Sequence, residues 1–509
     1  MLFTEPTFLF LFLPILLALY FLLPALRPLR AKRLRLERGA GGKPGAAGPP
    51  SESERGSGPA SIRNWVLLVA SVIFYAKGGG SFTWLMLGSI AFNYWIAIAI
   101  DRRRETAKIL LLFAVAVNLA VLGVFKYANF FADNVNALFL VLRLNPVAVP
   151  RVLLPIGISF FTFHAISYVV DVYRGDAIAQ KSPVHAALYL LLFPQLIAGP
   201  IIRYRDIADQ LARRVVGLDD FAYGVRRFIV GLAKKVLVAN IVAGPADRIF
   251  GTPADQLTAR LAWLGIVCYT LQIYFDFSGY SDMAIGLGRM FGFRFPENFR
   301  WPYIAETVQE FWRRWHISLS TWFRDYLYVP LGGSRVTPGR MYVNLVTVFF
   351  LCGLWHGAKW NFVVWGLFHG TFLVLERLGI ANAIGRLPAP VRHAYLLVVV
   401  MIGWVFFRAD TLTGAIAFLK ALAGLSPEAP TPFTIQWYVT PDVAIALLAG
   451  TIGSLPIVPA LARWVDEAPR PGLGRGFAAA STATLLVLLL ASIMHVAARA
   501  YNPFIYFRF

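Results

Sequence analysis

Long apolar runs, separated by short polar stretches, follow one another along almost the whole chain. Several runs reach the ~20 residues that an α-helix needs to cross a hydrocarbon core of ~30 Å. Backbone groups inside a bilayer must hydrogen-bond to one another, so runs of this length are expected to be helical. The candidate segments, some of them expected to be short or re-entrant, are residues 8–26, 62–77, 82–100, 109–125, 152–170, 185–201, 225–243, 261–291, 341–356, 360–377, 393–408, 442–460 and 480–497.

This pattern predicts an all-α, polytopic membrane protein with about 11 transmembrane helices, together with re-entrant and interfacial helices. Composition agrees, because 58% of the residues are hydrophobic and only 15% are charged. No stretch has the pattern of a separate soluble domain. We therefore expect residues 1–509 to form a single membrane domain.

Two basic loops predict the orientation of the chain. Residues 27–63 are rich in Arg and Lys, and residues 102–108 hold three arginines and one lysine. Two predicted spans separate these loops, so both fall on one side. Positively charged loops favour the cytoplasm, which places the N-terminus in the periplasm. Within the first loop, the Gly-, Pro- and Ser-rich composition of residues 31–61 predicts a flexible cytoplasmic loop.

The formal net charge of +21 has two interpretations. Lys and Arg between apolar runs set membrane orientation, and they could also form a docking surface for an anionic cofactor or an acidic partner. No motif supports nucleic-acid binding. Cys268 and Cys352 both lie in apolar segments, without the spacing of a disulfide framework or a zinc site, so no metal is expected.

If residues 305–328 form one helix, that helix has a polar stripe along one face. The sequence of this segment is AETVQEFWRRWHISLSTWFRDYLY. Such a helix could lie at the membrane interface, with its cations against lipid headgroups. Alternatively, its arginines could bind the phosphate oxygens of an anionic thioester carrier beside a histidine. Spacings of four, three, four and four residues place on that stripe Gln309, Arg313, His316, Ser320 and Arg324.

A second histidine, His356, follows an apolar run and stands beside glycines. We expect a helix to end at Gly353–Gly357 and another to begin near Asn361. Irregular backbone at membrane depth is tolerated where protein or a water-filled cavity surrounds it. His356 is therefore a candidate for a reactive group in a small cavity. For two carboxylates in the preceding run 271–291, Asp276 and Asp282, bracing between helices is the favoured role.

Four internal stretches and the C-terminus resemble the membrane-bound O-acyltransferase family, in particular its bacterial polysaccharide branch, typified by the alginate O-acetyltransferase membrane subunit. The resemblance covers nearly the whole chain. The matching stretches are FPQLIAGPIIRY at 193–204, FDFSGYSDMAIGLGRMFGFRFPENF at 275–299, FWRRWHISLSTWFRDYLYVPLGG at 311–333, LWHGAKWNFVVWG at 354–366 and NPFIYFRF at 502–509.

This resemblance implies an enzyme of the bacterial inner membrane, with a ring of tilted helices around a central tunnel. It implies transfer of an acetyl group from cytoplasmic acetyl-CoA across the membrane, for O-acetylation of an extracellular or periplasmic polysaccharide. The family's essential histidine corresponds to His356, and a second functional position corresponds to His316. Many eukaryotic members have an asparagine at this second position.

The chemistry of a thioester fits these two histidines. The thiolate leaves readily, so the difficult step is to make the acceptor hydroxyl nucleophilic. Burial favours neutral imidazole, the form that a general base needs, and we expect His356 to take the hydroxyl proton. His316 would polarise the thioester carbonyl or orient the donor. Arg313 and Arg324 would hold the donor's phosphates or contact lipid headgroups.

The aromatic C-terminal motif at 502–509 holds one phenol near its end, Tyr506. Tyrosine and phenylalanine are frequent at headgroup depth, which favours an interfacial anchor. Similar motifs in the resembling branch are thought to present tyrosine as a transient acyl acceptor. Tyr506 is therefore also a candidate acyl relay, with a nearby histidine as its base.

The absence of a soluble domain bears on how an acetyl group would reach a polymer. The resemblance implies a separate periplasmic transferase, often of the SGNH-hydrolase type. Other family reactions remain open, namely O-acetylation of peptidoglycan and D-alanylation of teichoic acids. A transporter or export channel is an alternative from a different class, because buried charges alone allow it.

Overall fold

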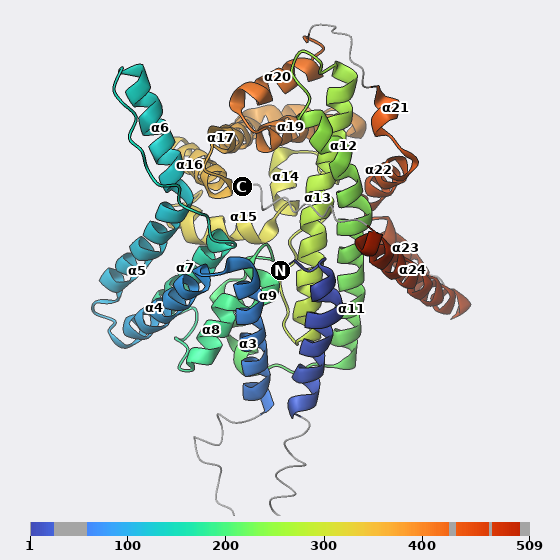
Figure 1. Ribbon diagram of the computed structural model, residues 1–509. Helices are drawn as coiled ribbons and strands as arrows, with labels where there is room; N and C mark the ends of the chain where they lie inside the picture. Colours follow the sequence, from blue (N-terminus) through green and yellow to red (C-terminus); the bar gives the residue numbers. More distant parts are fainter. Residues whose placement is uncertain (1, 25–58, 427–433, 468–470, 499–509) are drawn as a thin grey trace, which may run out of the picture.

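The computed structural model describes residues 2–24, 59–426, 434–467 and 471–498, which form helices and no strand (Figure 1). The loop expected at residues 31–61 lies mostly outside these ranges, and its last residues begin α3. The first elements are the helix Phe8–Pro24, of which η1 (Phe8–Phe12) is π-helical, α3 (Pro59–Gly79), α4 (Phe82–Arg102), α5 (Ala107–Leu122), η2 (Gly123–Tyr127), α6 (Ala128–Val141), α7 (Ile158–Arg174), α8 (Pro183–Leu191), α9 (Phe193–Leu196) and α10 (Tyr204–Ala212).

The middle of the chain contributes the long helices and the short ones that lie at the centre. These are α11 (Leu218–Ala233), η3 (Lys234–Ala239), α12 (Asn240–Phe250), α13 (Ala259–Met290), η4 (Pro302–Ile304), α14 (Val308–Arg314), α15 (Ile317–Phe323) and η5 (Arg324–Tyr328). The C-terminal elements are α16 (Pro338–His356), α17 (Trp360–Leu375), η6 (Glu376–Ile380), α18 (Ala381–Gly385), α19 (Ala389–Arg408), α20 (Leu412–Leu422), α21 (Ile435–Tyr438), α22 (Pro441–Gly453), α23 (Ile457–Glu467) and α24 (Pro471–Ala498).

Seven helices in the described ranges are long and apolar enough to cross a membrane, and the bent pair α22–α23 would make an eighth. A multi-pass helical membrane protein is thus confirmed, but the predicted number of about 11 spans is not. Two of the predicted apolar runs are interrupted. The run 185–201 is split between α8 and α9, with Pro194 at the start of α9, and the run 152–170 becomes helical only from Ile158.

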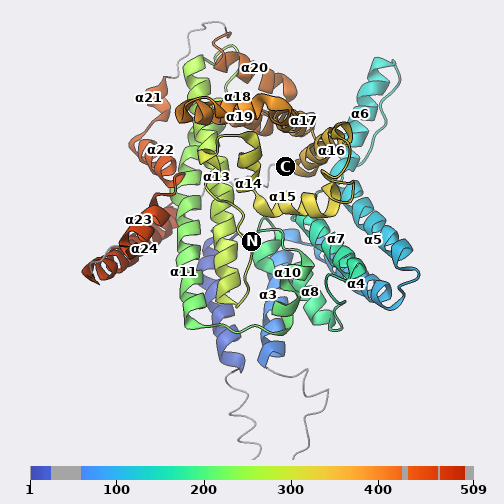
Figure 2. The same ribbon diagram turned by 180° about the vertical axis from the view of Figure 1, so that it is seen from behind.

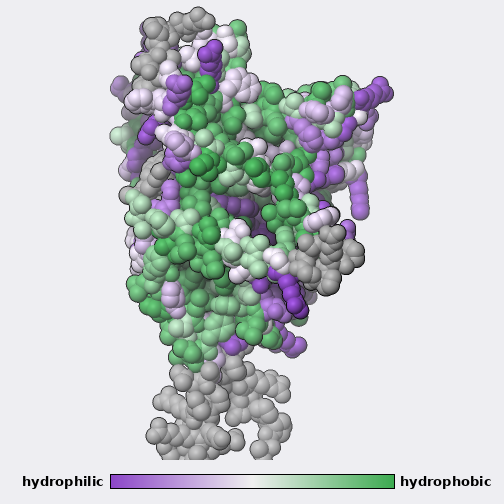
Figure 3. All heavy atoms as spheres, turned by 90° about the vertical axis from the view of Figure 1, so that its right-hand side faces the viewer, coloured by the Kyte–Doolittle hydropathy of each residue, from purple (hydrophilic) through white to green (hydrophobic). Residues whose placement is uncertain are grey.

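The outer surface is apolar, as a bilayer requires. Hydrophobic side chains cover most of the face in Figure 3, and hydrophilic ones gather mainly toward its edges. On α22 and α24, for example, Ile445, Leu448, Val487 and Leu490 are each more than 60% exposed. Exposure of this kind is unfavourable in water but is expected against lipid tails.

Two contacts identify one side of the molecule. Arg104, in the basic loop after α4, donates through Nη1 to the carbonyls of Val172 and Tyr173 at the end of α7, both at 3.2 Å. Asn64, near the start of α3, donates to the carbonyl of Leu211 at the end of α10, at 2.9 Å. The consecutive helices α3 and α4 run away from this side and return to it. We call it the basic side, and the opposite one the far side.

The interior is built around α13, whose side chains are almost all buried. Glycines allow α11 to approach it closely, because a Cβ on Gly231 would lie 2.6 Å from the Gly279 carbonyl oxygen. Ion pairs add to this contact: Asp282 meets Lys234 at 2.7 Å, and Asp276 meets Lys235 at 2.6 Å. The predicted bracing role of both carboxylates is therefore confirmed.

Short helices occupy the centre of the molecule. In Figures 1 and 2, α14 and α15 lie between α13 on one flank and α7 and α16 on the other. Their connection carries His316, and the end of α16 carries His356. The long helices thus enclose the two histidines that the sequence singled out.

Candidate active site

The segment 305–328 is not the single helix that its periodicity predicts. α14 ends at Arg314 and α15 begins at Ile317, because His316 between them has the left-handed backbone angles φ 43° and ψ 54°. The predicted polar stripe is therefore broken at its middle. Arg313 is exposed on α14, and Arg324 lies beyond the end of α15.

The break is held open by the preceding segment. The N–H of Arg300 donates to the Arg314 carbonyl at 2.9 Å, and the N–H of Ile317 donates to the Asn298 carbonyl at 3.0 Å. The Asn298 side-chain oxygen also accepts from the N–H and the hydroxyl of Ser318, at 3.2 and 2.9 Å. Backbone strain of a non-glycine residue persists only where its surroundings over-determine it, and these bonds do so.

The same asparagine defines the tautomer of His316. Oδ1 of Asn298 lies 3.0 Å from Nδ1 of His316, and a carbonyl oxygen can only accept. The hydrogen of a neutral ring is therefore on Nδ1, and its lone pair is on Nε2. His316 is 1% exposed, and Nε2 has no hydrogen-bond partner among the described residues. A buried, unpaired acceptor of this kind is available to a substrate group.

His356 ends α16, as predicted, and Gly357 continues in an extended conformation. Its imidazole is held between aromatic rings, with centroid distances of 4.9 Å to Trp355, 5.0 Å to Trp365 and 5.1 Å to Phe407. The Trp355 ring also lies 6.3 Å from that of His316. One indole therefore contacts both histidines.

The α16–α17 hairpin that carries His356 depends on glycine. A Cβ on Gly353 would clash with the Phe362 carbonyl oxygen, and one on Gly366 would clash with that of Phe349. The two helices thus pack backbone to backbone near the turn. This close packing fixes the end of α16 against α17 and leaves the imidazole little freedom.

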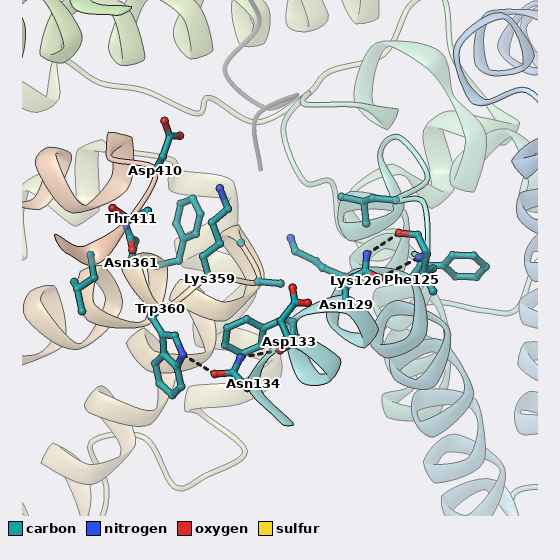
Figure 4. Close-up of a pocket in the computed structure, with 17 residues that line it drawn as sticks. Phe125, Lys126, Asn129, Asp133, Asn134, Lys359, Trp360, Asn361, Asp410 and Thr411 are labelled. Atoms are coloured by element: carbon teal, nitrogen blue, oxygen red, sulfur yellow. Dashed lines mark hydrogen bonds between the residues drawn. The ribbon is translucent and has the colours of Figure 1, made fainter. Parts of the chain in front are cut away.

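Two adjoining cavities reach this centre. A cavity of about 180 Å³ is lined by His356 and Trp355 together with Lys126, Leu154 and neighbouring residues. A larger one of about 630 Å³ shares Lys126 and Leu154 with it. Figure 4 shows residues of α6 facing those at the start of α17 across the larger cavity. His356 is thus open to a cavity, while a continuous tunnel through the protein stays a prediction.

The lining of the larger cavity is mixed in chemistry. Charged groups, Lys126, Lys359, Asp133 and Asp410, stand beside amides and aromatic rings. Trp360 donates through Nε1 to Asn134 at 2.8 Å, which links α17 to α6 (Figure 4). The α6 part of this lining belongs to the continuous helix Ala107–Val141, which starts at the basic loop after α4 and leads away from the basic side. This wall of the cavity therefore lies toward the far side.

A column of stacked aromatic rings runs from Trp355 toward the basic side. Trp355 stacks on Phe163 at 5.2 Å, Phe163 on Trp322 at 3.7 Å, and Trp322 on Tyr326 at 5.1 Å between ring centroids. Trp322 also donates to the Ser167 hydroxyl at 2.9 Å. This ring column connects Trp355, which contacts both histidines, with the next cluster of charges.

That cluster, the Asp325 cluster, consists of Arg174, Arg203, Arg205, Arg324 and Asp325. Asp325 pairs with Arg203, with Arg205 at 2.7 Å and with Arg324 at 2.7 Å, and its carbonyl accepts from Arg174 at 3.1 Å. Burial opposes ionisation, but the guanidinium of Arg324 and then those of Arg203 and Arg205 hold the pKa of the Asp325 carboxyl below its usual range. Because α7 ends here, the cluster lies on the basic side.

The structure does not bring Arg313 to this cluster or to the cavities described above. A donor-binding role for Arg313 and Arg324 therefore remains a prediction, as does the relay role of Tyr506, which lies outside the described residues. Sequence reasoning missed Asn298 and Lys126. Asn298 lies in the PENF stretch quoted above, and Lys126 was detectable as a lone cation directly after the apolar run 109–125.

The model of the membrane-bound O-acyltransferase family matches residues 177–407, which include both histidines. The chain is 41% identical to "Probable alginate O-acetylase AlgI" of Azotobacter vinelandii and 40% identical to the protein of that name in Pseudomonas putida, over the full length of all three. It is 37% identical to "Peptidoglycan O-acetyltransferase" of Helicobacter pylori, over 71% of this chain and 73% of that one.

Proposed function

Because the chain belongs to the membrane-bound O-acyltransferase family, we propose that it takes an acetyl group from cytoplasmic acetyl-CoA and moves it across the inner membrane for O-acetylation of an extracellular or periplasmic polysaccharide. One observation carries the proposal. Two buried imidazoles contact the same indole, that of Trp355, and His356 lines a cavity that adjoins a larger one. Ionisable groups at membrane depth are costly and commonly mark function.

In the reaction, Nε2 of His356 accepts the proton of the acceptor hydroxyl. The oxygen attacks the thioester carbonyl carbon, a new C–O bond forms, and the C–S bond breaks. The thiolate then takes the proton from the imidazolium, so the enzyme returns to its starting state. General base catalysis typically contributes ~10²–10⁴-fold, and positioning of the two substrates must supply much of the rest.

His316 acts on the donor. With its hydrogen on Nδ1 and held by Asn298, neutral His316 presents a lone pair at Nε2. A lone pair can accept a hydrogen bond from an amide of the donor's pantetheine arm and so orient the thioester. Only the protonated ring could donate to the thioester carbonyl. Burial opposes that form, so orientation of the donor is the role that this geometry favours.

The two substrates approach from opposite sides. The donor comes from the basic side, where positively charged loops favour the cytoplasm, and this orientation places the N-terminus in the periplasm. The acceptor enters through the larger cavity on the far side. Arg313 and Arg324 would meet the donor's phosphates before the thioester reaches the histidines.

The acetyl group reaches the polysaccharide in two further transfers. Tyr506 would accept it from the donor, with His356 as base, and pass it on. A separate periplasmic transferase, of the SGNH-hydrolase type, would then place it on the polysaccharide, since no soluble domain is expected in this chain.

The test is incubation of the purified full-length protein with radiolabelled acetyl-CoA, followed by intact-mass analysis. We expect covalent label on the C-terminal peptide, and no label when the last six residues are removed or when Tyr506 is replaced by Phe. Release of CoA without label would refute the relay and retain the transferase. No CoA release with any acceptor would refute the function itself.

Acetylation of peptidoglycan is a second candidate, favoured by the 37% identity to the Helicobacter pylori protein. "Teichoic acid D-alanyltransferase" of Bacillus subtilis is 30% identical, over 43% of this chain, which gives D-alanylation weaker support. A transporter would move substrate without covalent transfer, so the labelling experiment separates it from all of these. Supplying either polymer with the partner transferase would identify the acceptor.

A further inference from the structure

The last carbonyl groups of α16 have no hydrogen-bond partner within the helix. The last intrahelical bond runs from Gly357 N–H to the Gly353 carbonyl at 3.3 Å. The next three carbonyls, those of Leu354, Trp355 and His356, lie past the last helical donor. Helix ends leave such carbonyls without partners, and unpaired polar groups at membrane depth are costly.

Two neighbouring side chains from η2 satisfy all three carbonyls. Tyr127 donates its hydroxyl to the Leu354 carbonyl at 2.8 Å. The Lys126 ammonium donates to the Trp355 carbonyl and contacts the His356 carbonyl at 3.4 Å. Both residues belong to η2, a π-helical bulge between α5 and α6, and both side chains reach the end of α16. Bulges of this kind are frequent at functional sites.

Lys126 is also joined to the other walls of the site. Its ammonium donates to the Ser159 hydroxyl at 3.1 Å and lies 5.7 Å from the centroid of the Trp355 ring. It lines both cavities. A positive charge at a helix C-terminus is favourable, because the last carbonyls carry partial negative charge. Lys126 Nζ thus links α7 to α16, and the same side chain lines both cavities.

We propose that Lys126 is a positioning residue for the acetyl transfer. It acts through His356: by holding the Trp355 and His356 carbonyls, it fixes the end of α16 so that the imidazole faces the smaller cavity. Tyr127 supports it by holding the Leu354 carbonyl. This inference rests on the proposed function, since the reaction in which His356 is positioned is the proposed one.

The test compares purified full-length variants in release of CoA from acetyl-CoA with the native acceptor system. Lys126→Met keeps the length of the side chain and removes its charge and donors. We expect kcat to fall by about 100-fold with little change in KM for acetyl-CoA, because small misplacements of a catalytic group have effects of that size. Lys126→Arg, which keeps charge and donors, should recover at least a tenth of the wild-type kcat. The matched control is Lys108→Met, which removes an exposed lysine from the same span and should behave as wild type.

The outcomes separate the two proposals. Wild-type protein that releases no CoA overturns the proposed function and leaves Lys126 without a reaction to position. Active wild type with an equally active, folded Lys126→Met overturns the positioning role. A loss that appears only as less folded protein, with kcat per folded molecule unchanged, overturns it as well. Should Lys126→Met fail to fold, Lys126→Gln, which retains a donor for one carbonyl, gives the same comparison.

Discussion

Oδ1 of Asn298 lies 3.0 Å from Nδ1 of His316, and the same oxygen accepts two hydrogen bonds from Ser318. The side-chain amide of Asn298 thus fixes the tautomer of His316. It also helps to hold α14 and α15 apart at the connection that His316 forms. The two effects occur at one residue, because His316 has the left-handed backbone that separates α14 from α15 and also carries the ring that faces Asn298.

The first prediction concerns Asn298. Asn298→Ala should reduce kcat about as much as His316→Ala does, because either change removes an oriented lone pair at Nε2. The double variant should then be no slower than either single variant, since residues that act as a unit are non-additive. Rates of CoA release, normalised to folded protein, check this. Additive losses would mean that the two residues act independently.

The second prediction concerns the base. His356→Ala should lower kcat by ~10²–10⁴-fold, the range typical of general base catalysis, with a smaller effect on KM for acetyl-CoA. His393→Gln serves as the control, because His393 lies on α19 beside Glu306, away from the cavities. Steady-state kinetics on both variants decide the matter. Near-normal transfer by the alanine variant would remove His356 from the mechanism.

The third prediction concerns the α11–α13 contact. Gly231→Ala should lower the free energy of unfolding by about 1–3 kcal/mol, because its Cβ would meet the backbone of α13 and the helices would have to separate. Gly88→Ala on α4 is the control, since nothing lies within 4 Å of its Cβ. Thermal unfolding in one detergent compares them. Equal midpoints would show that α13 can shift without penalty.

The fourth prediction concerns pH and the Asp325 cluster. The pKa of Asp325 is lowered in the folded protein, so its charge stabilises the fold above the unfolded pKa of about 3.9, and this contribution is lost as pH falls through the folded value. Asp325→Asn should therefore unfold at a lower temperature than wild type at pH 7, with the gap closing on acidification. Asp133→Asn, in the exposed pair with Arg151, should change little. A gap that persists at low pH would contradict this account.

Much of this molecule could be predicted from local patterns. Apolar run lengths predicted a multi-pass helical protein, and the glycines around His356 predicted the helix end there. The break at His316 could not be predicted in this way, because its cause, Asn298, lies 18 residues earlier in the chain and acts through tertiary hydrogen bonds. Lys126 was missed for a similar reason: its partners lie 229 and 230 residues away. The number of spans is not confirmed, because periodicity does not reveal where an apolar run is interrupted.

The ring column from Trp355 to Tyr326 bears on how the cell keeps its ion gradients. A passage wide enough for a thioester and a hydroxyl acceptor would, if filled with water, also conduct protons. Stacked rings exclude water and offer no chain of hydrogen bonds along which a proton could hop. For the transfer across the membrane that is proposed above, such a stack would preserve the voltage between the two compartments.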